Sequence, residues 1–192
     1  MSESTDTAAP RAGRPPKLDE HGTPTRERLV QAAIAACVEH GYEGATLSDI
    51  AQRAGVSTPA VYGYFAGKDE LMLIAARDAF ENITTHPEGT DGAGIVRAWM
   101  SEDAVDERRM LLELHRAAGR HHELRQLIDE WAREQSRVLR QLGLGPVRIK
   151  LVFLVMFGLL HLEDIDGLEA DHDGLVDDAV ALVNGLVGLP RG

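Results

Sequence analysis

The fold of this chain is decided by residues 45–65, which read ATLSDIAQRAGVSTPAVYGYF. Thr46 and Asp49 match the pattern in which a threonine caps a helix and an acidic residue follows three positions later. Apolar residues then recur at helical spacing until Gly55, a residue type that commonly ends helices. A second helix of about two turns is expected from Ser57, because the proline two positions later is tolerated in a first helical turn. The stretch therefore predicts a helix-turn-helix.

The rest of the chain also has the apolar periodicity of helices. One helix is expected from Pro24, with Thr23 as its N-cap, to Gly41, and another begins after Gly67. Apolar spacings of three and four residues predict later helices at about 94–104, 105–119, 121–142, 146–163 and 174–188. We find neither the alternation typical of strands nor an internal repeat. The predicted fold class is therefore all-α.

Composition narrows the class of protein. The single cysteine, Cys37, rules out a disulfide framework, and its place on an apolar stripe predicts an inert thiol. The first 25 residues hold no apolar core of a secretory signal. The longest uncharged apolar run, residues 151–162, is shorter than the about 20 residues that a membrane span needs. We therefore expect a cytoplasmic protein that does not contact a membrane.

The net charge of −11 argues at first against a nucleic-acid partner, because phosphates attract basic surfaces. Residues 163–178, however, contain eight acidic side chains and no basic one. Residues 25–68 carry four charges of each sign, and residues 11–17 carry three basic charges and no acidic one. The acidic excess thus lies far along the chain from the predicted helix-turn-helix and does not exclude DNA.

Residues 24–75 resemble the N-terminal domain of TetR-family transcriptional regulators. Four segments carry the resemblance: ATLSDIA at 45–51, AGVS at 54–57, VYGYF at 61–65 and KDEL at 68–71. The resemblance implies a homodimer in which a three-helix DNA-binding domain precedes an all-α domain that binds a ligand and dimerises. It also implies that a small molecule releases the protein from DNA.

Composition and the resemblance together predict three parts. These are a disordered basic arm at 1–22, a helix-turn-helix domain at 23–68, and a helical effector-binding and dimerisation domain at 69–192. The implied function is that of a sequence-specific regulator, a repressor released from a palindromic operator in double-stranded DNA by an effector. The alternative is an all-α ligand-binding or interaction protein whose helix-turn-helix does not bind DNA. Activation in place of repression stays open.

Candidate DNA contacts follow from the matched positions. Two of them begin helices, whose free amides attract phosphate, and two are tyrosines whose hydroxyls can reach phosphate oxygens, whereas Phe65 is expected in the core. The second helix lacks the Arg, Lys, Asn and Gln side chains that read bases, so apolar contacts and DNA shape are expected to contribute. Arg53 reaches a base or phosphate, or else lies in solvent. The candidates are Arg14, Thr46, Arg53, Ser57, Thr58, Pro59, Tyr62, Tyr64 and Lys68.

The arm contributes Arg14 to this set. Its Gly-Arg-Pro sequence within residues 11–17 looks like the core of an AT-hook, which lays an extended arginine into a narrow minor groove. A disordered tail without that role is the alternative.

The C-terminal half predicts a dimer and a pocket. The helices at about 146–163 and 174–188 have wider apolar faces than one core requires, so they are expected to form a four-helix interface with a second copy. Apolar and half-polar residues of the middle helices are the candidate effector pocket, although ordinary core would look the same. They are Trp99, Met100, Leu111, Leu114, His115, Ala118, Trp131, Phe153, Phe157 and His161.

Known metal-binding and catalytic motifs do not match the residue spacings of this sequence. The acidic run at 163–178 lies near His161 and His172, but it lacks the glycine that an EF-hand loop needs at its sixth position. No complete nucleophile elbow, P-loop or dinucleotide fingerprint is present. We therefore expect neither an enzyme nor a bound metal or cofactor, and we expect the acidic run to be a solvated connector.

Overall fold

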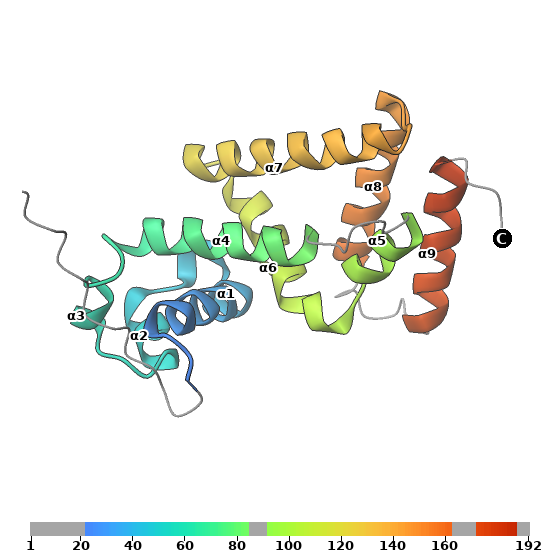
Figure 1. The fold of residues 1–192 in the computed structure, drawn as a ribbon. Helices are drawn as coiled ribbons and strands as arrows, with labels where there is room; N and C mark the ends of the chain where they lie inside the picture. The colour runs from blue at the N-terminus through green and yellow to red at the C-terminus, as the bar shows by residue number, and fades with distance from the viewer. Residues whose placement is uncertain (1–21, 85–91, 163–171, 188–192) are drawn as a thin grey trace, which may run out of the picture.

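The computed structural model describes residues 22–84, 92–162 and 172–187 (Figure 1). In chain order, the elements are α1 (Thr25–Gly44), α2 (Leu47–Arg53), α3 (Thr58–Val61), α4 (Lys68–Thr84), α5 (Gly92–Trp99), the 3₁₀ turn η1 (Glu102–Ala104), α6 (Val105–Ala117), α7 (His122–Gln141), α8 (Pro146–Leu162) and α9 (His172–Val187). These ranges contain no β-strand, so the all-α prediction is confirmed. The basic arm and most of the acidic run lie outside the described residues.

The first helix packs through the stripe that its sequence predicts. Leu29, Ala33 and Cys37 recur every fourth residue and are fully buried. The N-cap is Pro24 and not Thr23 as predicted. Gly41 leaves the helical conformation with a φ of +72°, which a glycine adopts at no steric cost, and one further turn continues to Gly44.

The segment predicted as one helix at 94–104 is two elements. Helix α5 ends at Trp99, and η1 follows with Ser101 as its N-cap, whose hydroxyl accepts a hydrogen bond from the Asp103 amide at 3.2 Å. The buried guanidinium of Arg108 donates to the carbonyl of Trp99 at 2.7 Å and to that of Ser101 at 2.6 Å. Arg108 thus satisfies the carbonyl of Trp99 at the end of α5 and shares that of Ser101 with the Ala104 amide, so it ties α5 and η1 to α6.

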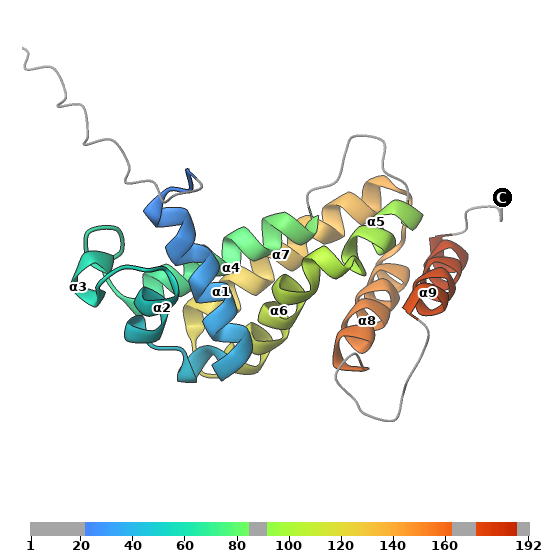
Figure 2. The ribbon, with the colours of Figure 1, turned by 90° about the horizontal axis from the view of Figure 1, so that it is seen from below.

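The helices form an elongated molecule with α4 along its middle. Figures 1 and 2 place α1, α2 and α3 at one end and α8 and α9 at the other. Helix α4 packs against α1, α6 and α7, and Leu71, Ala75 and Ala79 are fully buried there. The last helix packs mainly against α5. Since α4 begins where the helix-turn-helix ends, one continuous helix runs from that end to α5, α6 and α7.

Candidate nucleic-acid interface

The connection between α2 and α3 is a left-handed turn at Gly55. This residue has a φ of +66°, and its amide donates to the carbonyl of Gln52 at 3.1 Å. The next amide, of Val56, donates to the carbonyl of Ala51 at 2.9 Å. These two bonds form a Schellman motif, which ends α2 at the predicted residue and fixes the direction of α3.

The second helix of the pair is shorter than predicted. Helix α3 is a single turn, Thr58–Val61. It continues as hydrogen-bonded turns in which the amides of Gly63 and Tyr64 reach the carbonyls of Ala60 and Val61 at 3.1 and 2.9 Å. Gly63 is a poor helix residue, and this explains why the regular helix stops before it.

Two tyrosines and a phenylalanine follow α3 with opposite exposures. The side chain of Phe65 is 2% exposed, as expected for the core, whereas Tyr62 is 60% and Tyr64 is 37% exposed. Large apolar rings held at the surface with a hydroxyl at the tip can contact phosphate while their bodies rest on the protein. Ser57 and Pro59 are exposed beside them and Thr58 is half-buried, so this end of the molecule presents mainly neutral groups.

Thr46 and Lys68 lie at the starts of α2 and α4. The hydroxyl of Thr46 accepts a hydrogen bond from the amide of Asp49 at 3.1 Å, as the capping pattern predicts, and a hydroxyl still has one hydrogen to donate. The ammonium of Lys68 donates to the carbonyl of Glu43 at 3.0 Å and lies 5.3 Å from the centre of the Tyr42 ring. These contacts hold the positive charge of Lys68 at the end of α1.

Arg53 is held by acidic neighbours. Its Nε lies 2.9 and 3.0 Å from the two carboxylate oxygens of Asp49, and its Nη2 lies 2.6 Å from Glu39. Its pKa is raised by the hydrogen bond to Glu39 first and by that to Asp49 second. To contact DNA, Arg53 would have to leave these partners or bind while its positive charge is offset by them.

The structure brings two arginines to the helix-turn-helix that sequence reasoning missed. Arg28 donates from Nη1 to the carbonyl of Ala54 at 2.9 Å and so anchors the end of α2 to α1. Arg26 is exposed, with its guanidinium carbon 5.5 Å from the centre of the Phe65 ring. Helical periodicity could not reveal either contact, because each joins segments that are distant in sequence. Arg14 lies outside the described residues.

Comparisons with known proteins agree with this geometry. The family model of bacterial regulatory proteins of the tetR family matches residues 29–75, which span α1 to the first half of α4. Residues 29–75 therefore form a TetR-family domain. The regulator SrpR of Pseudomonas putida is 39% identical over 80 residues, and the match covers 39% of this chain and 34% of SrpR. The nicotine-responsive repressor HdnoR of Paenarthrobacter nicotinovorans is 39% identical over 74 residues, 38% of each chain.

Solved structures extend the likeness of fold over most of the chain. A TetR-family member from Streptomyces coelicolor superimposes with a TM-score of 0.67 at 23% identity, covering 84% of this chain and 97% of that one. The fatty acid degradation regulator FadR of Bacillus halodurans gives a TM-score of 0.66 at 19% identity, covering 88% and 98%. The matches to SrpR and HdnoR, by contrast, span only about a third of those proteins.

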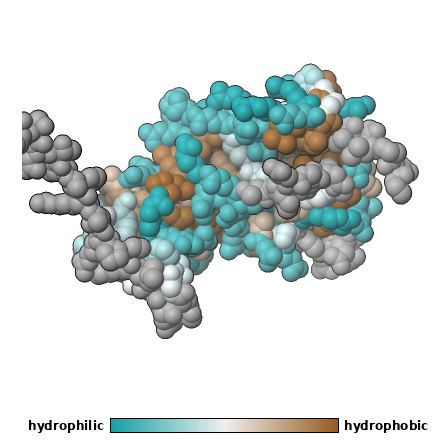
Figure 3. All heavy atoms as spheres, in the orientation of Figure 1, coloured by the Kyte–Doolittle hydropathy of each residue, from teal (hydrophilic) through white to brown (hydrophobic). Residues whose placement is uncertain are grey.

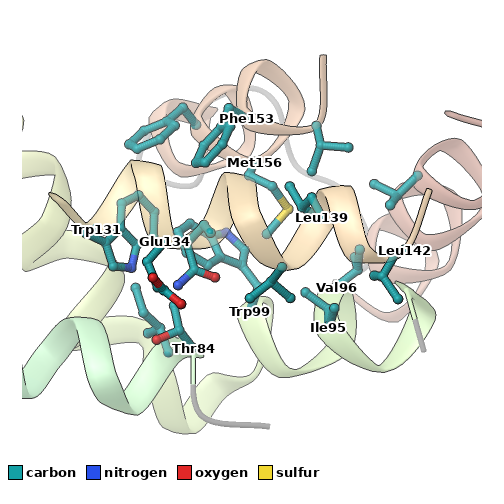
Figure 4. Close-up of a pocket in the computed structure, with 16 residues that line it drawn as sticks. Thr84, Ile95, Val96, Trp99, Trp131, Glu134, Leu139, Leu142, Phe153 and Met156 are labelled. Carbon is teal, nitrogen blue, oxygen red and sulfur yellow. The ribbon is translucent and has the colours of Figure 1, made fainter. Parts of the chain in front are cut away.

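The C-terminal half of the chain contains a cavity of about 300 Å³ (Figure 4). Figure 4 shows Trp131 and Leu139 of α7 facing Phe153 and Met156 of α8, with α5 below them and Leu142, just after α7, at one end. Its lining residues are Ile83, Thr84, Ile95, Val96, Trp99, Trp131, Glu134, Gln135, Val138, Leu139, Leu142, Val152, Phe153, Met156, Phe157 and Val183. A hydrophobic area at the upper right of Figure 3 lies where α5, α7 and α8 meet.

Four of the predicted pocket residues line this cavity: Trp99, Trp131, Phe153 and Phe157. Met100, Leu111 and Leu114 are buried away from it, and Ala118 is half-buried elsewhere on the molecule. His115 packs on Phe157 with ring centres 4.5 Å apart, and its Nδ1 lies 2.9 Å from the carbonyl of Leu111. His161 is exposed. Sequence reasoning missed the other twelve lining residues. Thr84, Glu134 and Gln135 carry no apolar signal, and the nine apolar residues look like ordinary core in sequence.

The end of α1 contacts the turn between α6 and α7. The carboxylate of Glu43 lies 2.8 Å from Nε2 of His121 and 3.3 Å from Nε of Arg120. The hydrogen bond with His121 is the main cause that lowers the pKa of Glu43. The ring of His121 also packs on Tyr42, with ring centres 4.7 Å apart. The helix-turn-helix is therefore joined to the C-terminal half here as well as through α4.

Helices α8 and α9 leave large apolar side chains in solvent. Val147 is 70% exposed, Leu154 67% and Leu182 52%. In the part of the chain that the structure describes, no helix is long and apolar enough to cross a membrane. The same described residues contain no group of three or more His, Cys, Asp or Glu side chains placed to hold a metal ion.

Proposed function

We propose that the protein is a sequence-specific DNA-binding transcriptional regulator, a repressor whose helix-turn-helix reads a palindromic operator. The observation that carries the proposal is the pair of exposed tyrosines, Tyr62 and Tyr64, beside a buried Phe65 at the end of α3. Tyrosine hydroxyls are common phosphate ligands, and phosphate contacts set the register of a helix in the major groove. Thr46 and Lys68 add a hydroxyl and a positive charge at the starts of α2 and α4.

The three tyrosines of the chain provide a matched test of this interface. Replacing Tyr62 or Tyr64 by phenylalanine removes only a hydroxyl, so DNA affinity should fall by about 1 kcal/mol for each lost hydrogen bond, with unchanged stability. Tyr42→Phe is the control, because its hydroxyl bonds to Asp69 at 3.3 Å and its ring is buried, so it should leave DNA affinity unchanged. Fragments selected from genomic DNA supply the probe, and fluorescence anisotropy measures the affinity. Equal effects of all three substitutions would contradict the assignment of the interface.

We propose a homodimer through α8 and α9 for the same function. A palindromic site needs two helix-turn-helix units related by a two-fold axis, and an apolar face on two helices suits a four-helix interface. Leu154→Glu should yield a monomer in sedimentation and lose operator binding. Gln126→Glu is the control: it introduces the same charge at an exposed position of α7 and should leave the dimer intact. A monomeric wild-type protein would overturn this part of the proposal.

The division into a DNA-binding domain at 23–68 and an effector domain at 69–192 remains part of the proposal. The contacts of α4 with both α1 and α6, and of Glu43 with His121, offer routes by which a ligand in the cavity can shift the helix-turn-helix. A protein with a ligand-responsive cavity but no salt-sensitive binding to any selected fragment would support the alternative, a ligand-binding protein with a non-functional helix-turn-helix.

A further inference from the structure

Both tryptophans of the chain line the cavity between α5, α7 and α8, and each has a donor without an acceptor. Trp99 is 5% exposed and Trp131 is 8% exposed. Their indole Nε1 atoms are buried and make no hydrogen bond to any described residue. Folded proteins pair nearly all of their buried polar groups. Two unpaired donors on the wall of one cavity therefore point to an acceptor that a ligand brings.

The remaining wall favours flat, apolar molecules. The ring of Trp131 lies 5.9 Å from that of Phe153, 6.4 Å from that of Phe157 and 6.3 Å from that of Trp99, measured between ring centres. Such spacings allow edge and stacked contacts with a further ring. Met156 adds a side chain that can adapt to an irregular shape.

The charges of the lining residues disfavour an ionic ligand. Among the described lining residues there is no lysine or arginine, and Glu134 is the one charged member. Its carboxylate already lies 2.9 Å from the guanidinium of Arg137 on the same helix. An anion would enter without a positive partner and beside a carboxylate, which is unfavourable in an apolar site. A cation would leave both indole donors unpaired.

We propose that this cavity binds an uncharged, mainly aromatic molecule with an acceptor oxygen, such as an aryl ketone, to which the indole N–H groups of Trp99 and Trp131 donate. The inference rests on the proposed function, since it names the chemical class of the effector. It specifies a ligand by its ring, its neutrality and its acceptor, and each of these properties can be varied separately.

The test uses the full-length protein and displacement of N-phenyl-1-naphthylamine, an uncharged aromatic probe that fluoresces in apolar sites. Four competitors share one ring: acetophenone, ethylbenzene, benzoate and benzylammonium. Acetophenone and ethylbenzene should displace the probe, and the two ions should not. Trp99→Phe and Trp131→Phe remove a donor and keep a ring. At least one of these substitutions should lower the affinity for acetophenone about three- to tenfold and change the affinity for ethylbenzene by less than about twofold, because only the ketone accepts a hydrogen bond.

Several results would overturn the proposal. If both substitutions lower the affinities for acetophenone and ethylbenzene equally, the tryptophans act by shape alone. Stronger displacement by either ion would assign a charged ligand, and failure of the probe to bind would mean that the cavity is filled by the chain itself or by a second copy. DNA binding is measured on the same samples without any compound, and Tyr62→Phe should keep the acetophenone response. If the unsubstituted protein binds no DNA but keeps its ketone response, the proposed function alone is rejected.

Discussion

Replacing Gly55 with alanine tests the turn that directs α3. At a φ of +66°, an L-residue costs about 1–2 kcal/mol relative to glycine. Alanine also restricts the unfolded chain, which offsets about 0.4–1 kcal/mol of that cost. The added Cβ would meet only Nη1 of Arg28, at 3.6 Å, which is an ordinary contact and adds no steric penalty. The net expectation is a loss of about 1 kcal/mol, or about 2–4 °C in melting temperature for a chain of this size.

Two other glycines are matched controls for Gly55→Ala. Gly143 connects α7 and α8 with a φ of +84° and has nothing within 4 Å of an added Cβ, so Gly143→Ala should cost a similar amount. Gly119 has the same free space without a positive φ, so Gly119→Ala should not lower the free energy of unfolding. Only the change at Gly55 should also weaken DNA binding, because only that turn orients α3.

Urea unfolding followed by circular dichroism measures these effects, at one protomer concentration because the stability of the proposed dimer depends on concentration. A shift in midpoint with an unchanged slope is expected for Gly55→Ala and Gly143→Ala. The reasoning is refuted if Gly55→Ala is as stable as Gly119→Ala, or if Gly143→Ala weakens DNA binding to the same extent.

Three further outcomes are expected. Thr46→Ala should cost about 1 kcal/mol by removing the cap on the Asp49 amide, whereas Thr46→Ser should cost much less; equal losses in urea unfolding would contradict the cap. Burial, with a smaller effect of the Glu113 charge, raises the pKa of Cys37 to about 12, so a thiol reagent at pH 8 should modify it only after unfolding, and rapid modification of the native protein would contradict this. Burial, and then the charge of His161, lowers the pKa of His115. The unfolded chain therefore binds its proton first as pH falls below about 6.5, and stability should decrease from pH 7 to 5 less steeply in His115→Gln.

The local structure of the helix-turn-helix could be predicted from its sequence because short-range rules govern it. The threonine cap at Thr46 and the glycine stop at Gly55 depend on residues within a few positions. The inward position of Phe65 follows from helical spacing. The ion pair of Arg53 with Glu39 and the hydrogen bond from Arg28 to the Ala54 carbonyl could not be predicted, since they arise only when α1 packs on α2.

The cavity was predictable only in part, for a different reason. Helix α8 is apolar on nearly every side, so its sequence has no periodicity that separates the faces toward the cavity, the core and solvent. Phe153 and Leu154 are neighbours in the chain, but the first lines the cavity and the second is 67% exposed. Polar lining residues such as Gln135 give no apolar signal at all. Tertiary packing, and not local pattern, decides which of these side chains can meet a ligand.

The most direct test of the account is a titration of the full-length protein against a fragment selected from genomic DNA, at several salt concentrations. We expect two protomers to bind each palindrome. Affinity should fall as salt increases, because binding releases the cations condensed on the DNA phosphates and added salt opposes that release. A scrambled fragment of the same composition should bind more weakly. The four basic side chains of residues 25–68 are few, so we expect a shallow salt slope. Equal affinity for selected and scrambled DNA, or no salt-sensitive binding, would contradict the claim that this helix-turn-helix reads an operator.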